Sequence, residues 1–325
     1  MHPALHRTLV TGGAGFLGSH LCARLVGSGT GVVCIDDFST GRAENLAAVA
    51  DSERFEVVEH DVAEPMLGYF VAGADRIFHL ASPASPRDYR ADEIGTLRTC
   101  VLGTMQVLEL ARRTGARVLV ASTSEVYGDP LVHPQPESYR GNVNPVGPRA
   151  CYDEGKRAAE AAAASYARQH GVDVRIARIF NTYGPHMRID DGRVLVSFVA
   201  QALRGEPITI YGDGEQTRSL CYVDDMIDGL VTLMESDAGV EPVNLGSDDE
   251  MRVLDIAEAV RRATGSQSDI VHEPLPADDP RQRRPDLARA RALGWSPRTS
   301  LADGLAATIA GVLADLARGR GITPA

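Results

Sequence analysis

The sequence contains little cysteine and less positive than negative charge, and both shortages exclude classes of protein. Only five of its 325 residues are cysteines, namely Cys22, Cys34, Cys100, Cys151 and Cys221. They are odd in number and form no CxxC pair, which argues against a disulfide framework and against a zinc site. We therefore expect no metal and a reducing, cytoplasmic environment. The formal net charge is −11, so neither nucleic acid nor an anionic membrane is an expected partner.

Long apolar runs are also missing. No stretch approaches the roughly 20 apolar residues that a membrane-spanning helix needs, and the first residues, MHPALHRTLVTGGAG, hold no long apolar segment. We therefore expect neither a signal peptide nor a membrane anchor. Hydrophobic residues make up 44% of the chain and charged residues 24%, which is ordinary for a globular protein of one large domain or two coupled ones.

Short apolar runs alternate with helix-like segments through the first 183 residues. The runs are rich in Val, Ile or Leu and are bounded by Gly, Asp or Ser; they span residues 7–11, 32–36, 55–59, 76–80, 117–122 and 174–180. The helix-like segments span residues 16–26, 43–49, 94–114 and 149–170. This order predicts an α/β fold with a Rossmann-type doubly wound parallel sheet.

The pattern changes after residue 183. Helix-like segments at 194–204, 223–236, 254–264 and 301–317 are separated by short extended pieces such as 207–211 and 242–245. We therefore expect two regions with approximate boundaries. Residues 1–183 would form an NAD-binding Rossmann domain, and residues 184–325 a smaller mixed α/β region that binds the substrate and is interwoven with the first.

A glycine-rich loop follows the first predicted strand and opens a helix. Gly12, Gly15 and Gly18 have the G-x-x-G-x-x-G spacing, which lets backbone N–H groups approach a pyrophosphate at the positive end of the helix. Asp36 ends the second strand, where a carboxylate accepts from a ribose 2′-hydroxyl and repels a 2′-phosphate, so NAD is favoured over NADP. A glycine-rich turn without a ligand is the alternative. Asp61 could meet the adenine edge or serve only as a turn or cap residue.

Tyr152 and Lys156 stand four residues apart at the start of a predicted helix, so their side chains share one face. A phenol is a poor base at neutral pH. A nearby ammonium group and a positive nicotinamide ring favour the phenolate, which then takes a hydroxyl proton as hydride leaves. Thr123 ends another strand and is placed to hydrogen-bond the reacting oxygen, and Ser124 and Glu125 follow it into the same cleft. Each pattern alone also occurs by chance, but their joint occurrence in this order favours a dehydrogenase-type site.

Several stretches are similar to one enzyme family. They are STSEVYGDP, HPQPESYRGNVNPVGPRACYDEGKR, RIFNTYGP, DGRVLVSF, GDGEQTRSLCYVDD, NLG and DDPRQRRPD. On these stretches the chain resembles, nearly end to end, the UDP-glucuronate decarboxylases (UDP-xylose synthases), which are extended short-chain dehydrogenases/reductases of the NAD-dependent epimerase/dehydratase family. The resemblance implies NAD as the cofactor and UDP-glucuronate as the substrate. It also implies oxidation at C4, loss of CO2 and re-reduction of the 4-keto intermediate to UDP-xylose.

The triplet Thr123-Ser124-Glu125 separates this family from its neighbours. Dehydratases of the superfamily usually carry Thr-Asp-Glu there, with the Asp as the acid for water loss, whereas 4-epimerases usually have a small residue in place of the Glu. The resemblance makes Tyr152 the base for the sugar 4-hydroxyl, with Lys156 holding it. It makes the catalytic set Thr123, Ser124, Glu125, Tyr152, Lys156 and Arg283.

The resemblance also implies two sets of binding residues. The cofactor set is Gly12, Gly15, Phe16, Leu17, Asp36, Asp37, Phe38, Ser39, Thr40, Gly41, Asp61, Val62, Leu80, Ala81, Ser82, Tyr152 and Lys156. The substrate set is Tyr89, Asn181, Tyr211, Gln216, Arg218 and Arg283, of which Asn181 and Arg218 match positions that hold the diphosphate. Alternatively, the arginines at 281–284 form an exposed charge run or pair with Asp278 and Asp279.

Three other activities stay open at this point. The chain could be an oxidative decarboxylase that releases the UDP-4-keto-pentose, or an epimerase or dehydratase that acts on another nucleotide sugar. A non-catalytic NAD-binding regulator is disfavoured, because such a protein would be expected to lose Tyr152 or Lys156. Members of the family that the chain resembles form homodimers through two long helices. The corresponding segments here are residues 94–114 and 149–170, so we expect a homodimer.

Three positions depart from the pattern of the resembling family. Cys100 stands where relatives usually have Asn, Gly95 where they often have Lys, and His186 where Arg is expected. A thiol replaces the hydrogen bonds of an amide poorly, and a missing Lys removes a positive charge near the sugar. These departures bear on carboxylate recognition and turnover rate.

Overall fold

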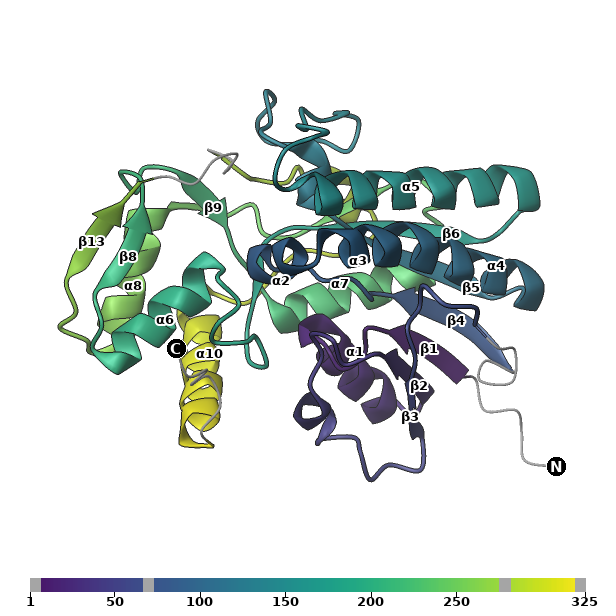
Figure 1. Ribbon diagram of the computed structural model, residues 1–325, viewed down its shortest axis with the longest axis horizontal. Coiled ribbons are helices and arrows are strands. Elements are labelled where there is room, and N and C mark those ends of the chain that lie inside the picture. The colour runs from purple at the N-terminus through teal and green to yellow at the C-terminus, as the bar shows by residue number, and fades with distance from the viewer. Residues whose placement is uncertain (1–6, 67–72, 275–281, 319–325) are drawn as a thin grey trace.

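The computed structural model describes residues 7–66, 73–274 and 282–318, and its centre is a seven-stranded parallel sheet (Figure 1). Neighbouring strands in the sheet follow the order β11-β6-β5-β4-β1-β2-β3, and each neighbouring pair is parallel. The strands are β1 (Arg7–Thr11), β2 (Gly31–Asp36), β3 (Phe55–Glu59), β4 (Ala74–His79), β5 (Arg117–Thr123), β6 (Val174–Ile179) and β11 (Val243–Leu245). The predicted doubly wound sheet is confirmed, and its order reverses between β1 and β4.

Helices cover both faces of the sheet because successive strand residues point to opposite sides. Val10 and Cys34 pack on one face with α1 (Phe16–Gly27), α7 (Val223–Glu235) and α9 (Ala288–Ala292). Their chain neighbours Leu9 and Val33 pack on the other face with α4 (Thr104–Thr114) and α5 (Ala150–His170). Strands buried on both sides explain the continuous Val- and Ile-rich runs in the sequence.

The predicted helix at 94–114 is interrupted by one wide turn. It consists of α3 (Glu93–Arg98), a π-helical turn at Thr99–Gly103 and α4. Cys100 lies in this turn and meets α5 where Gly155 has no side chain; a Cβ at position 155 would lie 2.9 Å from Cys100 Cβ. The segment at 43–49 is likewise shorter than predicted, with a 3₁₀ helix over Ala43–Leu46 only.

The second half of the chain builds a smaller unit around its own core, in which Phe198, Ile210 and Ile256 are fully or almost fully buried. Its helices are α6 (Val194–Arg204), α8 (Val253–Thr264) and α10 (Leu301–Ala317). Its strands pair as β8 (Ile208–Tyr211) with β13 (Ile270–Glu273), β9 (Thr217–Ser219) with β12 (Glu250–Arg252), and β7 (Thr182–Tyr183) with β10 (Cys221–Tyr222). However, α7 and β11 also come from this half and complete the main sheet. The boundary at residue 183 stays a prediction.

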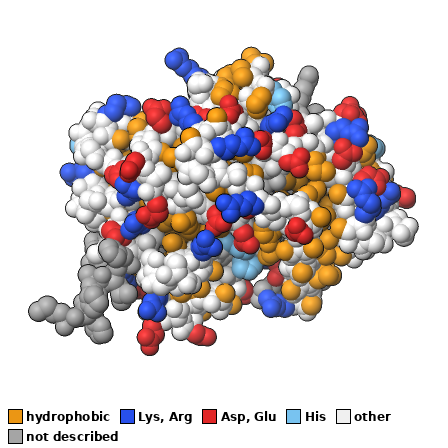
Figure 2. Space-filling model, turned by 180° about the vertical axis from the view of Figure 1, so that it is seen from behind, with side chains coloured by type: hydrophobic (Ala, Val, Ile, Leu, Met, Phe, Trp, Pro, Cys, Tyr) orange, Lys and Arg blue, Asp and Glu red, His pale blue; other side chains and the backbone are white. Residues whose placement is uncertain are grey.

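Charged side chains are spread over the surface of the protein. Figure 2 shows acidic and basic side chains interspersed over the face seen from behind, with hydrophobic side chains gathered toward the side on which α10 lies. Among the described residues, no helix combines the length and the apolar character required to cross a bilayer.

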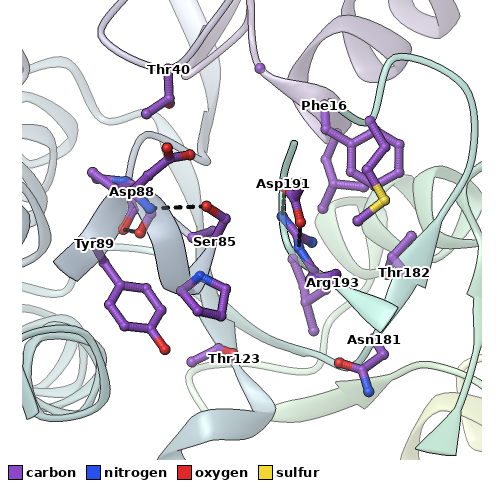
Figure 3. A pocket seen from close by; sticks show the side chains of 18 of the residues that line it. Phe16, Thr40, Ser85, Asp88, Tyr89, Thr123, Asn181, Thr182, Asp191 and Arg193 are labelled. Atoms are coloured by element: carbon purple, nitrogen blue, oxygen red, sulfur yellow. Dashed lines mark hydrogen bonds and ion pairs between the residues drawn. The ribbon is translucent and has the colours of Figure 1, made fainter. Parts of the chain in front are cut away.

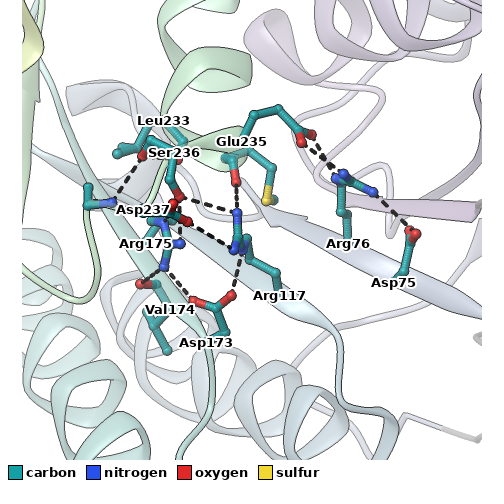
Figure 4. Close-up of polar contacts among 12 residues, drawn as sticks. Asp75, Arg76, Arg117, Asp173, Val174, Arg175, Leu233, Glu235, Ser236 and Asp237 are labelled. Atoms are coloured by element: carbon teal, nitrogen blue, oxygen red, sulfur yellow. Dashed lines mark hydrogen bonds and ion pairs between the residues drawn. The ribbon is translucent and has the colours of Figure 1, made fainter. Parts of the chain in front are cut away.

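Two arginines from the amino ends of neighbouring strands cap the carboxyl end of α7 (Figure 4). Arg117 Nη1 donates to the carbonyls of Met234 (2.9 Å) and Ser236 (3.2 Å), and Arg175 Nε donates to Ser236 O at 2.9 Å. Both also pair with Asp173. A positive charge at a helix carboxyl end is favourable and satisfies carbonyls that lack helical partners. These contacts attach α7 to β5 and β6.

We expect Arg175→Ala to lower the free energy of unfolding by roughly 1–3 kcal/mol, because it removes a buried guanidinium group that donates twice to Ser236 O and leaves Arg117 to cap the end of α7. Arg76→Ala is the matched control: Arg76 forms a bidentate pair with Glu235 on the same edge, but both side chains are substantially exposed. Its loss should cost less than about 1 kcal/mol. Chemical denaturation of both variants measures the difference, and equal effects would contradict the special role of Arg175.

Candidate active site

A cavity of about 450 Å³ lies where the carboxyl ends of the strands face the second half of the chain. Most of the predicted site residues line it. They are Gly12, Gly15, Phe16, Leu17, Asp36, Asp37, Ser39, Thr40, Val62, Leu80, Ala81, Ser82, Tyr89, Thr123, Ser124, Glu125, Tyr152, Lys156, Asn181, Tyr211, Gln216, Arg218 and Arg283. Phe38, Gly41 and Asp61 are not part of the cavity wall. Asp61 Oδ1 instead accepts from the backbone N–H of Ala63 at 2.8 Å, as a turn residue does.

The glycine-rich loop has no room for side chains. Gly12 has φ +70°, and a Cβ there would lie 2.7 Å from the backbone nitrogen of Ala81. A Cβ on Gly18 would lie 2.0 Å from the carbonyl oxygen of Gly12. The loop therefore presents bare backbone to the cavity at the amino end of α1, where the helix dipole is positive. This cradle fits the pyrophosphate of a dinucleotide.

Two carboxylates close the far end of this cradle. Asp36 ends β2, where its Oδ2 accepts from Ala14 N at 2.8 Å and its Oδ1 from Phe38 N at 2.9 Å. Burial raises the pKa of Asp36. Asp37 accepts from the backbone N–H and the hydroxyl of Ser39. Two acidic side chains at this place are unfavourable for a 2′-phosphate, which fits a preference for NAD over NADP.

Tyr152 lies deep in the cavity, stacked on Tyr89 with 5.2 Å between ring centroids and an interplanar angle of 6°. Thr123 hydrogen-bonds its phenol. Lys156 Nζ is 5.8 Å from the ring centroid of Tyr152 and donates to the carbonyl of Ala121 at 2.9 Å. Figure 3 shows Thr123 near the Tyr89 ring in the cavity wall.

Burial acts against the charged forms of both Tyr152 and Lys156. Burial raises the pKa of Tyr152 well above its ordinary value, with Thr123 acting in the opposite direction, and burial lowers the pKa of Lys156. In the cofactor-free chain the phenol is therefore protonated. Lys156 alone does not ionise it, because the ammonium is held on a β5 carbonyl and desolvation outweighs a charge at this distance.

Glu125 occupies the other wall of the reacting end, between two arginines. Arg283 donates to both of its carboxylate oxygens, with Nη2 at 2.8 Å from Oε2, and Arg149 also donates to Oε2. Burial alone would raise the pKa of Glu125, but Arg283 and Arg149 outweigh it and lower the pKa to about 2. Glu125 is thus a carboxylate at neutral pH.

The alternative of an exposed arginine run is wrong for Arg283, which is only 5% exposed and reaches into the cavity. Asp278 and Asp279, its other suggested partners, lie outside the described residues. Arg149 was not predicted for the site. It precedes Tyr152 by one helical turn, so the spacing could have identified it as a cation on the same face.

A group of ion pairs from α2 (Pro86–Ala91) and the loop before α6 was also missed. Arg188 pairs with Asp88 at 3.3 Å and with Asp190 at 3.0 Å, and Arg193 forms a bidentate pair with Asp191. Figure 3 shows Asp88 and Asp191 on opposite sides of the cavity. These residues carry ordinary charges in loops or short helices, and no spacing in the sequence relates the two segments.

Of the predicted substrate residues, Tyr89 and Arg283 lie at the reacting end of the cavity, and the other four line the cavity as well. Tyr211 is 51% exposed, and its carbonyl accepts from Gln216 Nε2 at 2.5 Å. Arg218 Nη1 donates to the carbonyl of Thr217 at 2.8 Å. The backbone carbonyl of Asn181 accepts from Cys221 N at 2.9 Å. The residue lines the cavity, and its side chain is drawn in Figure 3.

Two of the three positions that depart from the family pattern, His186 and Cys100, contact neighbouring side chains. His186 has φ +68°, and its Nδ1 lies 3.0 Å from Ser19 Oγ. Its ring is tilted by 38° against the ring of His20, with 4.7 Å between the ring centroids. Cys100 is buried beside Tyr89 and Tyr152, with its Sγ 3.2 Å from Ser82 Oγ. The thiol therefore has one polar contact where an amide would offer several.

Comparisons with known proteins agree with this geometry. The NAD dependent epimerase/dehydratase family model matches residues 8–246. UDP-glucuronic acid decarboxylase 1 of Arabidopsis thaliana is 54% identical over 300 residues, which is 92% of this chain and 68% of that protein. UDP-glucuronic acid decarboxylase 1 of Danio rerio is 51% identical over 93% of this chain and 72% of its own length.

Solved structures are similar over nearly the whole chain. UDP-glucuronic acid 4-epimerase from Bacillus cereus, in complex with UDP-glucuronic acid and NAD, has a TM-score of 0.85 and 29% identity, covering 95% of this chain and 99% of that one. UDP-glucose 4-epimerase from Thermotoga maritima with UDP-glucose has a TM-score of 0.88 and 29% identity, with the same coverage.

We expect Gly12→Ala to reduce NAD binding at least tenfold. The added methyl group would collide with the backbone of Ala81, and the alanine would have to adopt the positive φ of Gly12, which is unfavourable for a residue with a Cβ. Gly27→Ala is the control, since a Cβ at this α1 position meets no atom within 4 Å among the described residues. Titration of each folded variant with NAD, followed by fluorescence or calorimetry, tests this. Unchanged affinity in Gly12→Ala would contradict the cradle.

Proposed function

The chain belongs to the NAD dependent epimerase/dehydratase family, and we propose that within it this protein is a UDP-glucuronate decarboxylase that forms UDP-xylose and CO2. The observation that carries the proposal is the reacting end of the cavity. There Arg283, a cation suited to a carboxylate, is buried on Glu125 in the same cavity as Tyr152 and Lys156. A neutral hexose would need no such cation.

When bound, NAD would supply a hydride acceptor for the sugar C4, and the hydride would return to the 4-keto intermediate. We propose that Tyr152 takes the proton of the 4-hydroxyl, with Thr123 hydrogen-bonded to the same oxygen. Because burial opposes the phenolate, the tyrosine acts as a base only when further positive charge is close. Lys156 contributes by its fixed position on the Ala121 carbonyl, from which it reaches the ribose side of the site.

The carboxylate step follows from the product of that oxidation. A ketone at C4 is in the β position to the C6 carboxylate, so the C5–C6 bond breaks with its electron pair moving to the ketone oxygen, and CO2 leaves. Protonation at C5 and return of hydride to C4 then give the pentose. We propose that Arg283 and Arg149 orient the carboxylate and that Ser124 and Glu125 act at the same end. Ser124 is no acid at neutral pH, which disfavours dehydration.

The nucleotide end of the substrate is assigned mainly to the second half of the chain. We propose that Asn181 and Arg218 bind the UDP diphosphate and that Tyr211 and Gln216 lie at the nucleoside. All four line the cavity. An acidic protein needs such a local cation to recruit an anionic substrate.

We also propose that the protein works in a reducing compartment, the cytoplasm, because its five cysteines are free thiols.

A homodimer through α3, α4 and α5 is also proposed. The α3–α4 stretch exposes four large apolar side chains, Ile94, Leu97, Leu102 and Met105, with Ile94 at 71%. Helix α5 runs beside this stretch (Figure 1), and its alanine-rich run at 158–164 suits close approach of a second helix. Contiguous exposed apolar residues of this kind are typical of an interaction surface.

Incubation of the purified protein with UDP-glucuronate and catalytic NAD should convert the substrate fully to UDP-xylose, with no lasting NADH, as followed by mass spectrometry and proton NMR. Tyr152→Phe should reduce turnover by at least 100-fold, whereas Tyr166→Phe on the same helix should leave it unchanged. Accumulation of a 4-keto-pentose with stoichiometric NADH would instead indicate oxidative decarboxylation. Absence of CO2 release would contradict the substrate.

In sedimentation equilibrium we expect a mass of two chains, each of 34.7 kDa. Ile94→Asp should shift the population toward single chains, because it buries a charge in the proposed interface. Leu131→Asp is the control, since Leu131 is 80% exposed in a loop outside these helices. A wild-type mass equal to one chain would contradict the dimer.

A further inference from the structure

Asp153 is a buried carboxylate that the reaction described above does not use. It follows Tyr152 in α5 and is only 6% exposed. Its Oδ1 is buried and has no hydrogen-bond partner among the described residues. Its Oδ2 lies 3.9 Å from Arg149 Nε, which is an ion pair but too long for a hydrogen bond. An ionised carboxylate in this position is poorly satisfied, and its neutral form is favoured.

Asp153 ends a row of four charged side chains that leads to the cavity. Arg283 pairs with Glu125, Glu125 with Arg149, and Arg149 with Asp153. Arg283, Glu125 and Arg149 line the cavity, whereas Asp153 lies behind Arg149. With both carboxylates ionised the row has no net charge, and with Asp153 protonated it has a charge of +1.

The groups that act on Asp153 come from each neighbouring segment. Glu125, from the 3₁₀ turn Ser124–Tyr127, and Glu154 oppose its ionisation, and Arg149 and Arg283 favour it. Tyr89 of α2 faces it as a neutral phenol. Burial and Glu125 dominate and raise the pKa of Asp153 to about 7. The proton is therefore bound below about pH 7 and lost above it.

A substrate carboxylate at Arg149 and Arg283 would be the third anion beside two cations. If Asp153 stayed ionised, a row of three carboxylates and two guanidinium groups would carry a buried charge of −1, which is costly. Protonation of Asp153 removes this excess and leaves Arg149 available to the substrate. Once CO2 has left, the third negative charge is gone and Asp153 can ionise again.

We propose that Asp153 is a positioning residue that binds a proton together with the carboxylate of the substrate, and so adjusts the charge of the Arg149–Glu125–Arg283 row to an anionic sugar. The inference rests on the proposed function, because it requires a uronate carboxylate at this end of the cavity. Asp153 acts through Arg149 and touches neither the cofactor nor the reacting atoms. The linkage makes carboxylate binding pH-dependent, whereas binding of the same nucleotide sugar without the carboxylate is not.

The first test is the pH dependence of KM for UDP-glucuronate with the holoenzyme. In the wild type, KM for UDP-glucuronate should be constant below about pH 7. Above this pH it should increase, with a slope that approaches tenfold per pH unit. The inhibition constant of UDP-xylose, which lacks the carboxylate, should not change with pH. Asp153→Asn mimics the neutral acid, so its KM should stay near the low-pH wild-type value from pH 6 to 8.5. Glu154→Gln, the adjacent carboxylate on α5, is the matched control: Glu154 is the weakest of the groups that act on Asp153, so this variant should keep the rise of KM, with only a small shift of its onset to lower pH.

The second test needs no change at position 153, so it also applies if Asp153→Asn does not fold. Calorimetric binding of UDP-glucuronate to Tyr152→Phe holoenzyme, which should not turn the substrate over, is measured at pH 7.5 in buffers of different ionisation enthalpy. We expect uptake of between about half a proton and one proton per UDP-glucuronate and none with UDP-xylose.

The outcomes separate the two proposals. Decarboxylation with no proton uptake and a flat KM overturns the role of Asp153 alone, as does a variant Asp153→Asn that keeps the wild-type pH profile. Absence of CO2 release by wild-type protein that binds NAD overturns the proposed function and this inference with it. Proton uptake that is equal for UDP-glucuronate and UDP-xylose also overturns the inference, because the linkage then belongs to the diphosphate.

Discussion

The enclosure of Glu125 between two guanidinium groups is the interaction on which the reacting end of the cavity depends. The three side chains come from separate segments: Glu125 follows β5, Arg149 precedes α5 and Arg283 belongs to the segment before α9. An unpaired buried charge is costly, so the carboxylate of Glu125 favours the meeting of these three segments. The same contact thereby joins the second half of the chain to the sheet and places an arginine beside Tyr152. Folding and anion recognition use one set of charges.

Burial favours the neutral forms of Tyr152 and Lys156, the two residues that carry the sequence signature of the family, and so opposes the charged forms that the reaction uses. It stabilises the neutral phenol of Tyr152 and weakens the charge on Lys156, so the ligand-free site is less reactive than the spacing suggests. Arg193 is the described cation that favours the phenolate of Tyr152 in this state, and it is already paired with Asp191. A buried catalytic pair of this kind is protected from solvent and depends on charge that arrives with its ligands.

Features that depend on residue type at fixed local spacing could be predicted from the sequence. The six longer strands, the glycine-rich loop, the Tyr152–Lys156 face and most of the cavity wall belong to this group. The π-helical turn at Thr99–Gly103 could not, because its composition is that of an ordinary helix; Cys100, which lies in this turn, packs on Gly155 in a different helix. The extended piece predicted at 242–245 is strand β11, but three residues carry too little pattern to predict that it joins the main sheet. Pairs such as Arg188 with Asp88 join segments a hundred residues apart, and neither partner differs from a surface charge in sequence.

The positions that depart from the family pattern bear on how an acidic chain binds an anionic substrate. Gly95 cannot carry a longer side chain without a shift, because a Cβ there would lie 2.1 Å from Asp92 Oδ2, the carboxylate group that caps α3. His186 is fixed to α1 and brings no permanent charge. The arginines at the reacting end, Arg149, Arg193 and Arg283, are each already paired with a carboxylate. A substrate anion at this end therefore competes with protein carboxylates for cations that are already paired. Affinity then depends on how readily those carboxylates give up their partners, and a carboxylate that can be neutralised by a proton gives up its partner at the lowest cost.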